Sequence, residues 1–157
     1  MKRNKIYLRI EDYIKENSEL INIKHYTGRE FLSFYNNKIR EINSFKYFDN
    51  GLDFTYIDDV YFFVLYIGDK MVGLAHIRKS PYINKTYWLS YLSILSKFEN
   101  KGYASKLTEY IFKWFSDNEL QFETSSYTEV GYLKLKPLFN KLSKLYNVKF
   151  IDKDNRF

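Results

Sequence analysis

The sequence predicts an α/β fold, and three observations carry this prediction. Residues 60–95 hold runs of β-branched and aromatic residues, which are typical of strands. From Gly102 onward the apolar residues recur at helical spacing, so helices and strands alternate in the second half of the chain. The chain has 157 residues and 45% hydrophobic content, enough to bury a core, so we expect a single domain over residues 1–157.

The N-terminal residues 1–58 are interpreted as a mainly helical part. Apolar residues between Phe31 and Ile42 recur at spacings near 3.6, which predicts a helix over about 29–43. The segment before Thr27-Gly28 fits either a strand or a helix.

The middle of the chain predicts three strands. Residues 60–67 and 71–78 are apolar runs joined by a glycine-containing turn, the pattern of a β-hairpin. Residues 86–95 alternate between two faces and form the third expected strand, which leads directly into the glycine segment.

The C-terminal third predicts helix, strand, helix and a short strand. A helix from Gly102 to about residue 117 has one apolar face and one polar face. The apolar face is Ala104, Leu107, Ile111, Trp114 and Phe115, and the polar face is Thr108, Glu109, Lys113, Ser116 and Asp117. Strands are expected at 120–125 and 148–151, with a helical pattern up to Leu145 between them. Pro137 predicts a kink in that helix or a helix start with Pro137 in its first turn.

The segment 96–107 is the most informative stretch for function. Gly102 and Ala104 lie two residues apart where a strand gives way to a helix, in a chain with only six glycines. Small residues let another group approach the backbone, and a helix start gathers amides that suit phosphate. The segment therefore indicates an anion-binding turn. A plain strand-to-helix turn with Asn100 as N-cap is the alternative.

Composition narrows the function classes. The chain has no cysteine and two histidines, which excludes disulfides and thiolate catalysis and leaves no expected metal site. No secretory leader or membrane-length apolar run is visible, so we expect a cytoplasmic protein without a membrane partner. The net charge of +6 favours polyanions. Residues 101–104 match the start of an RNA-binding signature, but the helical period that follows makes nucleic acid an unfavoured partner.

The order of elements and the glycine segment resemble the GCN5-related N-acetyltransferase (GNAT) family over residues 60–135. The family's signature is Gln or Arg, two residues, Gly, one residue, then Gly or Ala, between its fourth strand and the next helix. Residues 99–104 occupy this motif, with Glu99 in place of Gln or Arg. Ile94 fits the apolar position five residues earlier, and Ser96 stands where the family often has proline.

The resemblance implies a twisted, mixed and mostly antiparallel sheet flanked by helices, with a variable N-terminal part and a cofactor-binding core over residues 59–157. It implies transfer of acetyl from acetyl-CoA to a primary amine by direct attack. The residues that would hold the pantetheine and pyrophosphate are Ile94, Leu95, Ser96, Glu99, Asn100, Lys101, Gly102, Tyr103, Ala104, Ser105 and Ser126. Tyr132 is the implied general acid, with Tyr127 as the alternative.

No general base stands out in the sequence. Four residues are candidates for this role, and the sequence favours none of them: Glu129, His76, Asp58 and Asp59. The acceptor is either a small amine or a protein amine, and a homodimer stays open. The alternatives to an enzyme are a non-catalytic acyl-CoA-binding or protein-interaction module, and in third place a basic nucleic-acid-binding domain.

Overall fold

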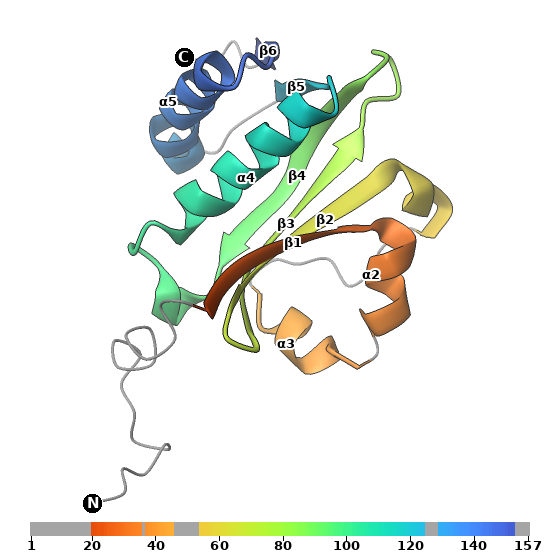
Figure 1. The fold of residues 1–157 in the computed structure, drawn as a ribbon, viewed down its shortest axis with the longest axis vertical. Helices are drawn as coiled ribbons and strands as arrows, with labels where there is room; N and C mark the ends of the chain where they lie inside the picture. Colours follow the sequence, from red (N-terminus) through yellow and green to blue (C-terminus); the bar gives the residue numbers. More distant parts are fainter. Residues whose placement is uncertain (1–19, 36, 46–53, 125–128, 153–157) are drawn as a thin grey trace, which may run out of the picture.

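A sheet of six strands in the order β1-β2-β3-β4-β5-β6 organises the chain (Figure 1). The computed structural model describes residues 20–35, 37–45, 54–124 and 129–152. The strands are β1 (Ile21–Thr27), β2 (Val60–Ile67), β3 (Lys70–Lys79), β4 (Thr86–Ile94), β5 (Gln121–Thr124) and β6 (Phe150–Asp152). Neighbouring strands from β1 to β4 are antiparallel, whereas β5 is parallel to both β4 and β6. The predicted mixed, mostly antiparallel sheet is confirmed.

Helices cover both faces of this sheet (Figure 1). On one face lie α4 (Tyr103–Asp117) and α5 (Glu129–Leu145), and on the other lie α2 (Gly28–Tyr35) and α3 (Ile39–Asn43). Two short 3-10 helices, η3 (Phe54–Asp59) and η4 (Ser96–Phe98), precede β2 and α4 respectively.

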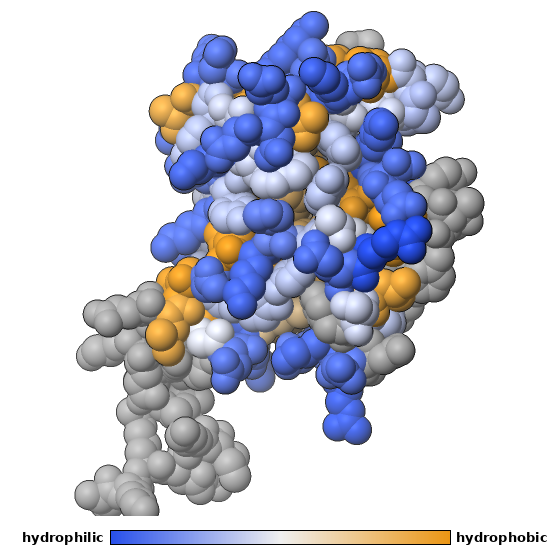
Figure 2. Space-filling view, turned by 45° about the vertical axis from the view of Figure 1, so that its right-hand side comes forward, coloured by the Kyte–Doolittle hydropathy of each residue, from blue (hydrophilic) through white to orange (hydrophobic). Residues whose placement is uncertain are grey.

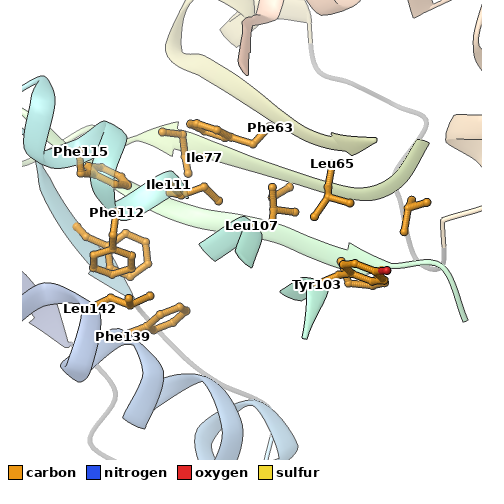
Figure 3. Close-up of a cluster of buried hydrophobic side chains, with 14 of the residues drawn as sticks. Phe63, Leu65, Ile77, Tyr103, Leu107, Ile111, Phe112, Phe115, Phe139 and Leu142 are labelled. Carbon is orange, nitrogen blue, oxygen red and sulfur yellow. The ribbon is translucent and has the colours of Figure 1, made fainter. Parts of the chain in front are cut away.

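The larger core lies between the sheet and the α4–α5 face (Figure 3). Leu107, Ile111 and Phe115 of α4 are almost completely buried against β2 and β3. Phe139 of α5 packs on Phe122 of β5 with ring centroids 5.0 Å apart. Burial of such aromatic side chains is worth about 1.5–3 kcal/mol each, so this face anchors both helices.

The second core lies under α2 and α3. Phe31 of α2 stacks on Phe62 of β2 at 3.9 Å between ring centroids, and Ile42 of α3 is fully buried beside them. On the face shown in Figure 2, the hydrophobic side chains form small separate groups among hydrophilic ones. Among the described residues, no helix combines the length and apolarity needed to cross a membrane.

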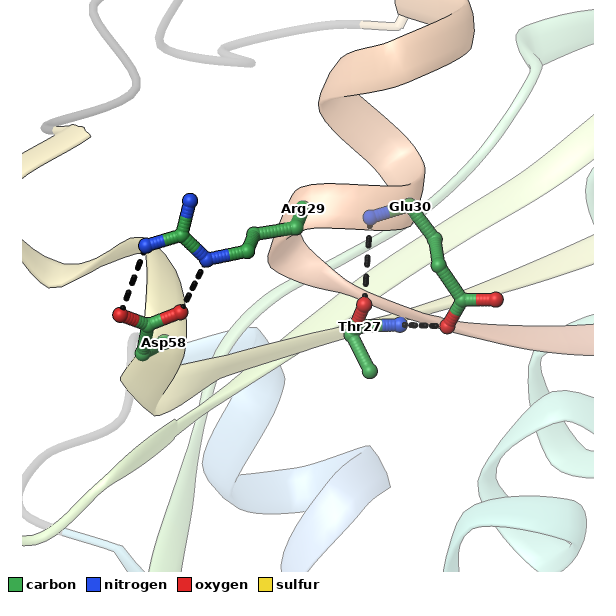
Figure 4. A network of polar contacts seen from close by, with 4 residues as sticks. All are labelled: Thr27, Arg29, Glu30 and Asp58. Atoms are coloured by element: carbon green, nitrogen blue, oxygen red, sulfur yellow. Dashed lines mark hydrogen bonds and ion pairs between the residues drawn. The ribbon is translucent and has the colours of Figure 1, made fainter.

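The start of α2 is closed by its own side chains (Figure 4). The Thr27 N–H donates to Glu30 Oε1 at 2.9 Å, and the Glu30 N–H donates to Thr27 Oγ1 at 3.1 Å, which is a reciprocal capping box. Next to it, Arg29 binds both carboxylate oxygens of Asp58, at 2.6 and 3.0 Å. This pairing ties α2 to η3.

Most predicted elements are confirmed, and three details differ. The helix expected over 29–43 is two helices, whereas the segment before Gly28 is strand β1, one of its two expected alternatives. Thr108 lies on the buried side of α4, where its hydroxyl donates to the Ala104 carbonyl at 2.7 Å. Helix α5 runs through Pro137 and does not start there, because residues on both sides of the proline pack on the core.

Candidate functional site

The site begins where β4 loses a neighbour. In the described part of the chain, β4 pairs with β5 only through Thr86, Tyr87 and Trp88, although β4 continues to Ile94. Within the described residues, the second half of β4 therefore has a strand partner on one side only, which is β3. Its other edge keeps backbone N–H and C=O groups for a different partner.

A β-bulge marks the same point of β4. His76 of β3 pairs with Tyr91 and Ile77 pairs with Leu89, so Ser90 is the extra residue. Bulges bend a strand and increase its local twist, and this one lies just beyond Trp88, the last residue of β4 that pairs with β5 in the described part of the chain. Ser90 and Tyr91 both contact His76: the Ser90 Oγ and His76 Nδ1 lie 2.5 Å apart, and the Tyr91 ring stacks on the imidazole.

The chain then turns sharply into α4. Asn100 has a φ of 62° and Gly102 a φ of 84°, so two of the three residues before the helix adopt left-handed backbone conformations. Gly102 is the N-cap and supplies no side-chain hydrogen bond, so Asn100 is not the N-cap that the alternative interpretation as a plain turn expected. The left-handed backbone that the turn requires moves the helix start two residues beyond Asn100. The first amides of α4 therefore lack a side-chain cap at this position.

A cavity of about 550 Å³ lies between the end of β4, this turn and α5. Its walls are Leu92, Ser93 and Ile94 of β4, Phe98, Glu99, Asn100, Gly102, Tyr103, Ala104 and Ser105 of the turn and helix start, and Lys134, Leu135 and Leu138 of α5. A Cβ placed on Gly102 would meet no atom within 4 Å, so the space above this glycine is open. Unpaired strand edge, uncapped amides and open space thus meet in one cavity.

Seven of the predicted cofactor residues line this cavity: Ile94, Glu99, Asn100, Gly102, Tyr103, Ala104 and Ser105. Leu95, Ser96 and Lys101 are neighbours in sequence but not part of its lining, and Leu95 lines a separate hollow beside α3. The Tyr103 side chain is only 4% exposed, so it belongs mostly to the core.

The predicted proton donors lie at the start of α5. Tyr132 is in the first turn of α5, ahead of the cavity residues Lys134 and Leu135, and the placement of its side chain is not described. Tyr127 and Ser126 lie outside the described residues.

The candidate general bases lie in different environments, which decide how well each could accept a proton. Asp58 is bound by Arg29, which lowers the pKa of its carboxyl. Burial and, to a smaller extent, Arg78 lower the pKa of His76 to about 4, so its imidazole is neutral at pH 7. Asp59, the last residue of η3, lines another hollow, and the side chain of Glu129 is not described.

Sequence reasoning missed Glu123. This glutamate lies on β5 opposite Trp88, at the last paired position of β4, and is 6% exposed. Its neighbour Phe122 packs under α4, so the alternation of a strand directs Glu123 to the opposite face. The signal in the sequence was a carboxylate inside a short strand, and its burial is uncommon because glutamates are seldom fully buried unless they are paired.

This strand order, with a parallel β4–β5 pair and a helix start that borders a cavity at the end of β4, is that of the acyl-CoA N-acyltransferase class of folds. The chain belongs to the acetyltransferase (GNAT) family, whose model matches residues 25–142.

Solved structures share this fold at low sequence identity. An aminoglycoside acetyltransferase from an uncultured soil metagenomic sample superposes with a TM-score of 0.54 and 14% identity, over 82% of this chain and 89% of that one. The ribosomal-protein-S18-alanine N-acetyltransferase of Escherichia coli gives 0.54 and 12%, over 78% and 76%. An IAA acetyltransferase of Bacillus cereus ATCC 14579 gives 0.54 and 14%, over 77% and 74%. Among curated proteins, none matches this chain.

Proposed function

We propose that the protein transfers an acetyl group from acetyl-CoA to a primary amine, by direct attack of the amine on the thioester. The observation that carries this proposal is the cavity in which the half-paired β4 edge meets the uncapped start of α4. Membership of the GNAT family and likeness to acetyltransferases, one of them solved in complex with CoA, support it.

The cofactor arm would run along the outer edge of β4. Backbone groups of Ile94, Leu95 and Ser96 would bind the pantetheine, and Ser126 would add a hydroxyl. Amides from Asn100 to Ser105 would bind the pyrophosphate, because the positive end of the α4 dipole points there. The open space at Gly102 lets a phosphate approach the backbone.

Charges around the turn act in opposite directions. Glu99 lines the cavity and would repel a pyrophosphate, whereas Lys97, Lys101 and Lys106 are exposed cations on the same turn and helix start. We expect the three lysines to outweigh Glu99, so that the pyrophosphate binds. Its binding should be weaker than it would be with a neutral residue at position 99.

Proton transfer needs a donor for the leaving thiolate and an acceptor for the amine proton. We propose Tyr132 as the donor, with Tyr127 as the alternative, because α5 begins beside the cofactor cavity. We propose Glu123 as the proton acceptor, since it is a buried carboxylate opposite Trp88, at the last position where β4 and β5 pair in the described part of the chain. His76 is a weaker candidate because its pKa of about 4 makes it a poor base at neutral pH.

Isothermal titration with acetyl-CoA, followed by an assay of free thiol release with a panel of amines, tests this function. Binding with amine-dependent thiol release is expected, and absence of binding at high micromolar acetyl-CoA would overturn the proposal. Binding without release from any amine would favour the non-catalytic acyl-CoA-binding module.

Two variants test the assigned roles. Tyr132→Phe and Glu123→Gln should each lower kcat by about 100-fold, the usual size of a general acid or base contribution, with little change in acetyl-CoA affinity. Glu119→Gln, on an exposed residue, is the matched control for Glu123→Gln and should leave kcat unchanged. Equal turnover by Glu123→Gln and the unaltered protein would remove Glu123 from the mechanism.

A further inference from the structure

A second hollow lies on the other side of the bulge from the cofactor cavity. It has a volume of about 490 Å³, within the range of small-molecule sites. Its lining comes from the last residue of η3, the end of β3 with the two residues that follow it, and the first half of β4: Asp59, Arg78, Lys79, Ser80, Pro81 and Trp88.

This hollow opens on the sheet face that carries the bulge residues. Ile77 and Leu89 pack in the core under α4, so their neighbours Arg78 and Trp88 project to the opposite face. His76 and Tyr91, which stack on each other, lie on that same face beside the core under α2. Trp88 precedes Ser90 by two residues, about 7 Å along a strand.

The charges around the hollow favour a ligand that carries an anionic group and a cationic group. Arg78 and Lys79 contribute two positive charges and Asp59 one negative charge. The adjacent Asp58 is already bound by Arg29 and does not offset these cations. Lys79 makes no ion pair with any residue that the structure describes. A guanidinium and an ammonium together suit a carboxylate or a phosphate, whereas Asp59 suits an ammonium.

Trp88 adds a surface for contact. Trp114 packs on Tyr61, Phe63 and Tyr87, but Trp88 has no aromatic partner within the described part of the chain. Its half-buried indole lines the hollow instead. An indole in this position can pack against the apolar chain that joins two charged ends of a ligand.

We propose that this hollow binds the acceptor, and that the acceptor is an amine that also carries a carboxylate or a phosphate. The acidic end lies at Arg78 and Lys79, and the amine reaches toward the bulge at Ser90. A polycationic acceptor, such as a polyamine or an aminoglycoside, is disfavoured because Arg78 and Lys79 repel it. This inference rests on the proposed function.

The test compares four amines of similar length that differ at the far end: 4-aminobutyrate, 3-aminopropyl phosphate, pentylamine and 1,4-diaminobutane. Binding to the full chain in the presence of CoA is measured by NMR, with the indole N–H signal of Trp88 as reporter. Either acidic amine should bind about tenfold tighter than pentylamine, since one charge-assisted contact is worth that much, and the diamine should bind weakest. The two acidic amines separate carboxylate from phosphate recognition.

A matched pair of variants locates the effect. Lys79→Glu should weaken the acidic amines about tenfold and remove their advantage over pentylamine. Lys113→Glu, an equal charge change on an exposed residue of α4, should not. Tighter binding of the diamine, or equal effects of both variants, overturns the acceptor assignment. Titration of acetyl-CoA on the same samples separates this outcome from failure of the proposed function.

Discussion

Two strand-to-helix junctions in this molecule use glycine in opposite ways. At the β1–α2 junction, a Cβ on Gly28 would lie 2.1 Å from the carbonyl oxygen of Ile57. At the β4–α4 junction, a Cβ on Gly102 would have no atom within 4 Å, although the φ of 84° is one that other residues rarely adopt. The space beside Gly28 is already occupied by other protein atoms, whereas the space beside Gly102 is open.

The caps of the two helices follow the same division. Helix α2 is capped by Thr27 and Glu30, and its first turn is tied to η3 through Arg29 (Figure 4). Helix α4 begins at an N-cap without a side-chain hydrogen bond, beside a cavity. A junction that satisfies its own backbone serves the fold, whereas one that leaves its amides open suits a ligand.

The same substitution at both glycines separates stability from binding, and Gly28→Ala should have the largest effect. The added methyl group would collide with the Ile57 backbone, so α2 or η3 must move. Overpacking of this kind costs about 1–3 kcal/mol, and disturbance of the adjacent cap adds to it. Urea denaturation should show this loss, while the protein that remains folded binds acetyl-CoA with unchanged affinity.

Gly102→Ala should instead affect the binding of acetyl-CoA more than the stability of the fold. A methyl group meets no protein atom there, so the cost in stability is backbone strain of about 1–2 kcal/mol at a positive φ. The methyl group would occupy the space in which a phosphate must approach the amides, so the affinity for acetyl-CoA should fall at least about tenfold. Isothermal titration measures this loss. An unchanged affinity would mean that the pyrophosphate binds elsewhere.

The sequence was sufficient where a periodic pattern was long. The hairpin of β2 and β3, strand β4 and helix α4 all form where apolar runs, an alternation or a helical spacing predicted them. The split between α2 and α3 was missed because apolar spacing continues across the break. The capping box of Thr27 and Glu30 was visible as Thr-x-x-Glu and was not used.

The site was harder to predict because it depends on backbone conformation and strand register. The spacing around Gly102 pointed to the turn, but the left-handed conformation of Asn100, which excludes it as N-cap, had only the general tolerance of asparagine for this conformation as its signal. The contact of His76 with Ser90 depends on a bulge that shifts the register. Glu123 gains its interest from its burial and from its place at the last described pair of β4 and β5, and neither follows from the sequence pattern alone.

Acid should weaken the β1–α2 junction, and this effect should be smaller than those of the two glycine substitutions. Hydrogen bonds from Thr27 lower the pKa of Glu30 below its usual 4.5. Because the folded-state pKa is the lower one, this contribution to stability is present above pH 4.5 and is lost as pH falls through the folded value. Glu30 is exposed, so water screens the interaction and the change is small. Thermal melts from pH 6 to 3 should show a shallower acid dependence in Glu30→Gln than in the unaltered protein. Identical slopes would mean that the Glu30 cap, although formed, adds no measurable free energy of folding at the β1–α2 junction.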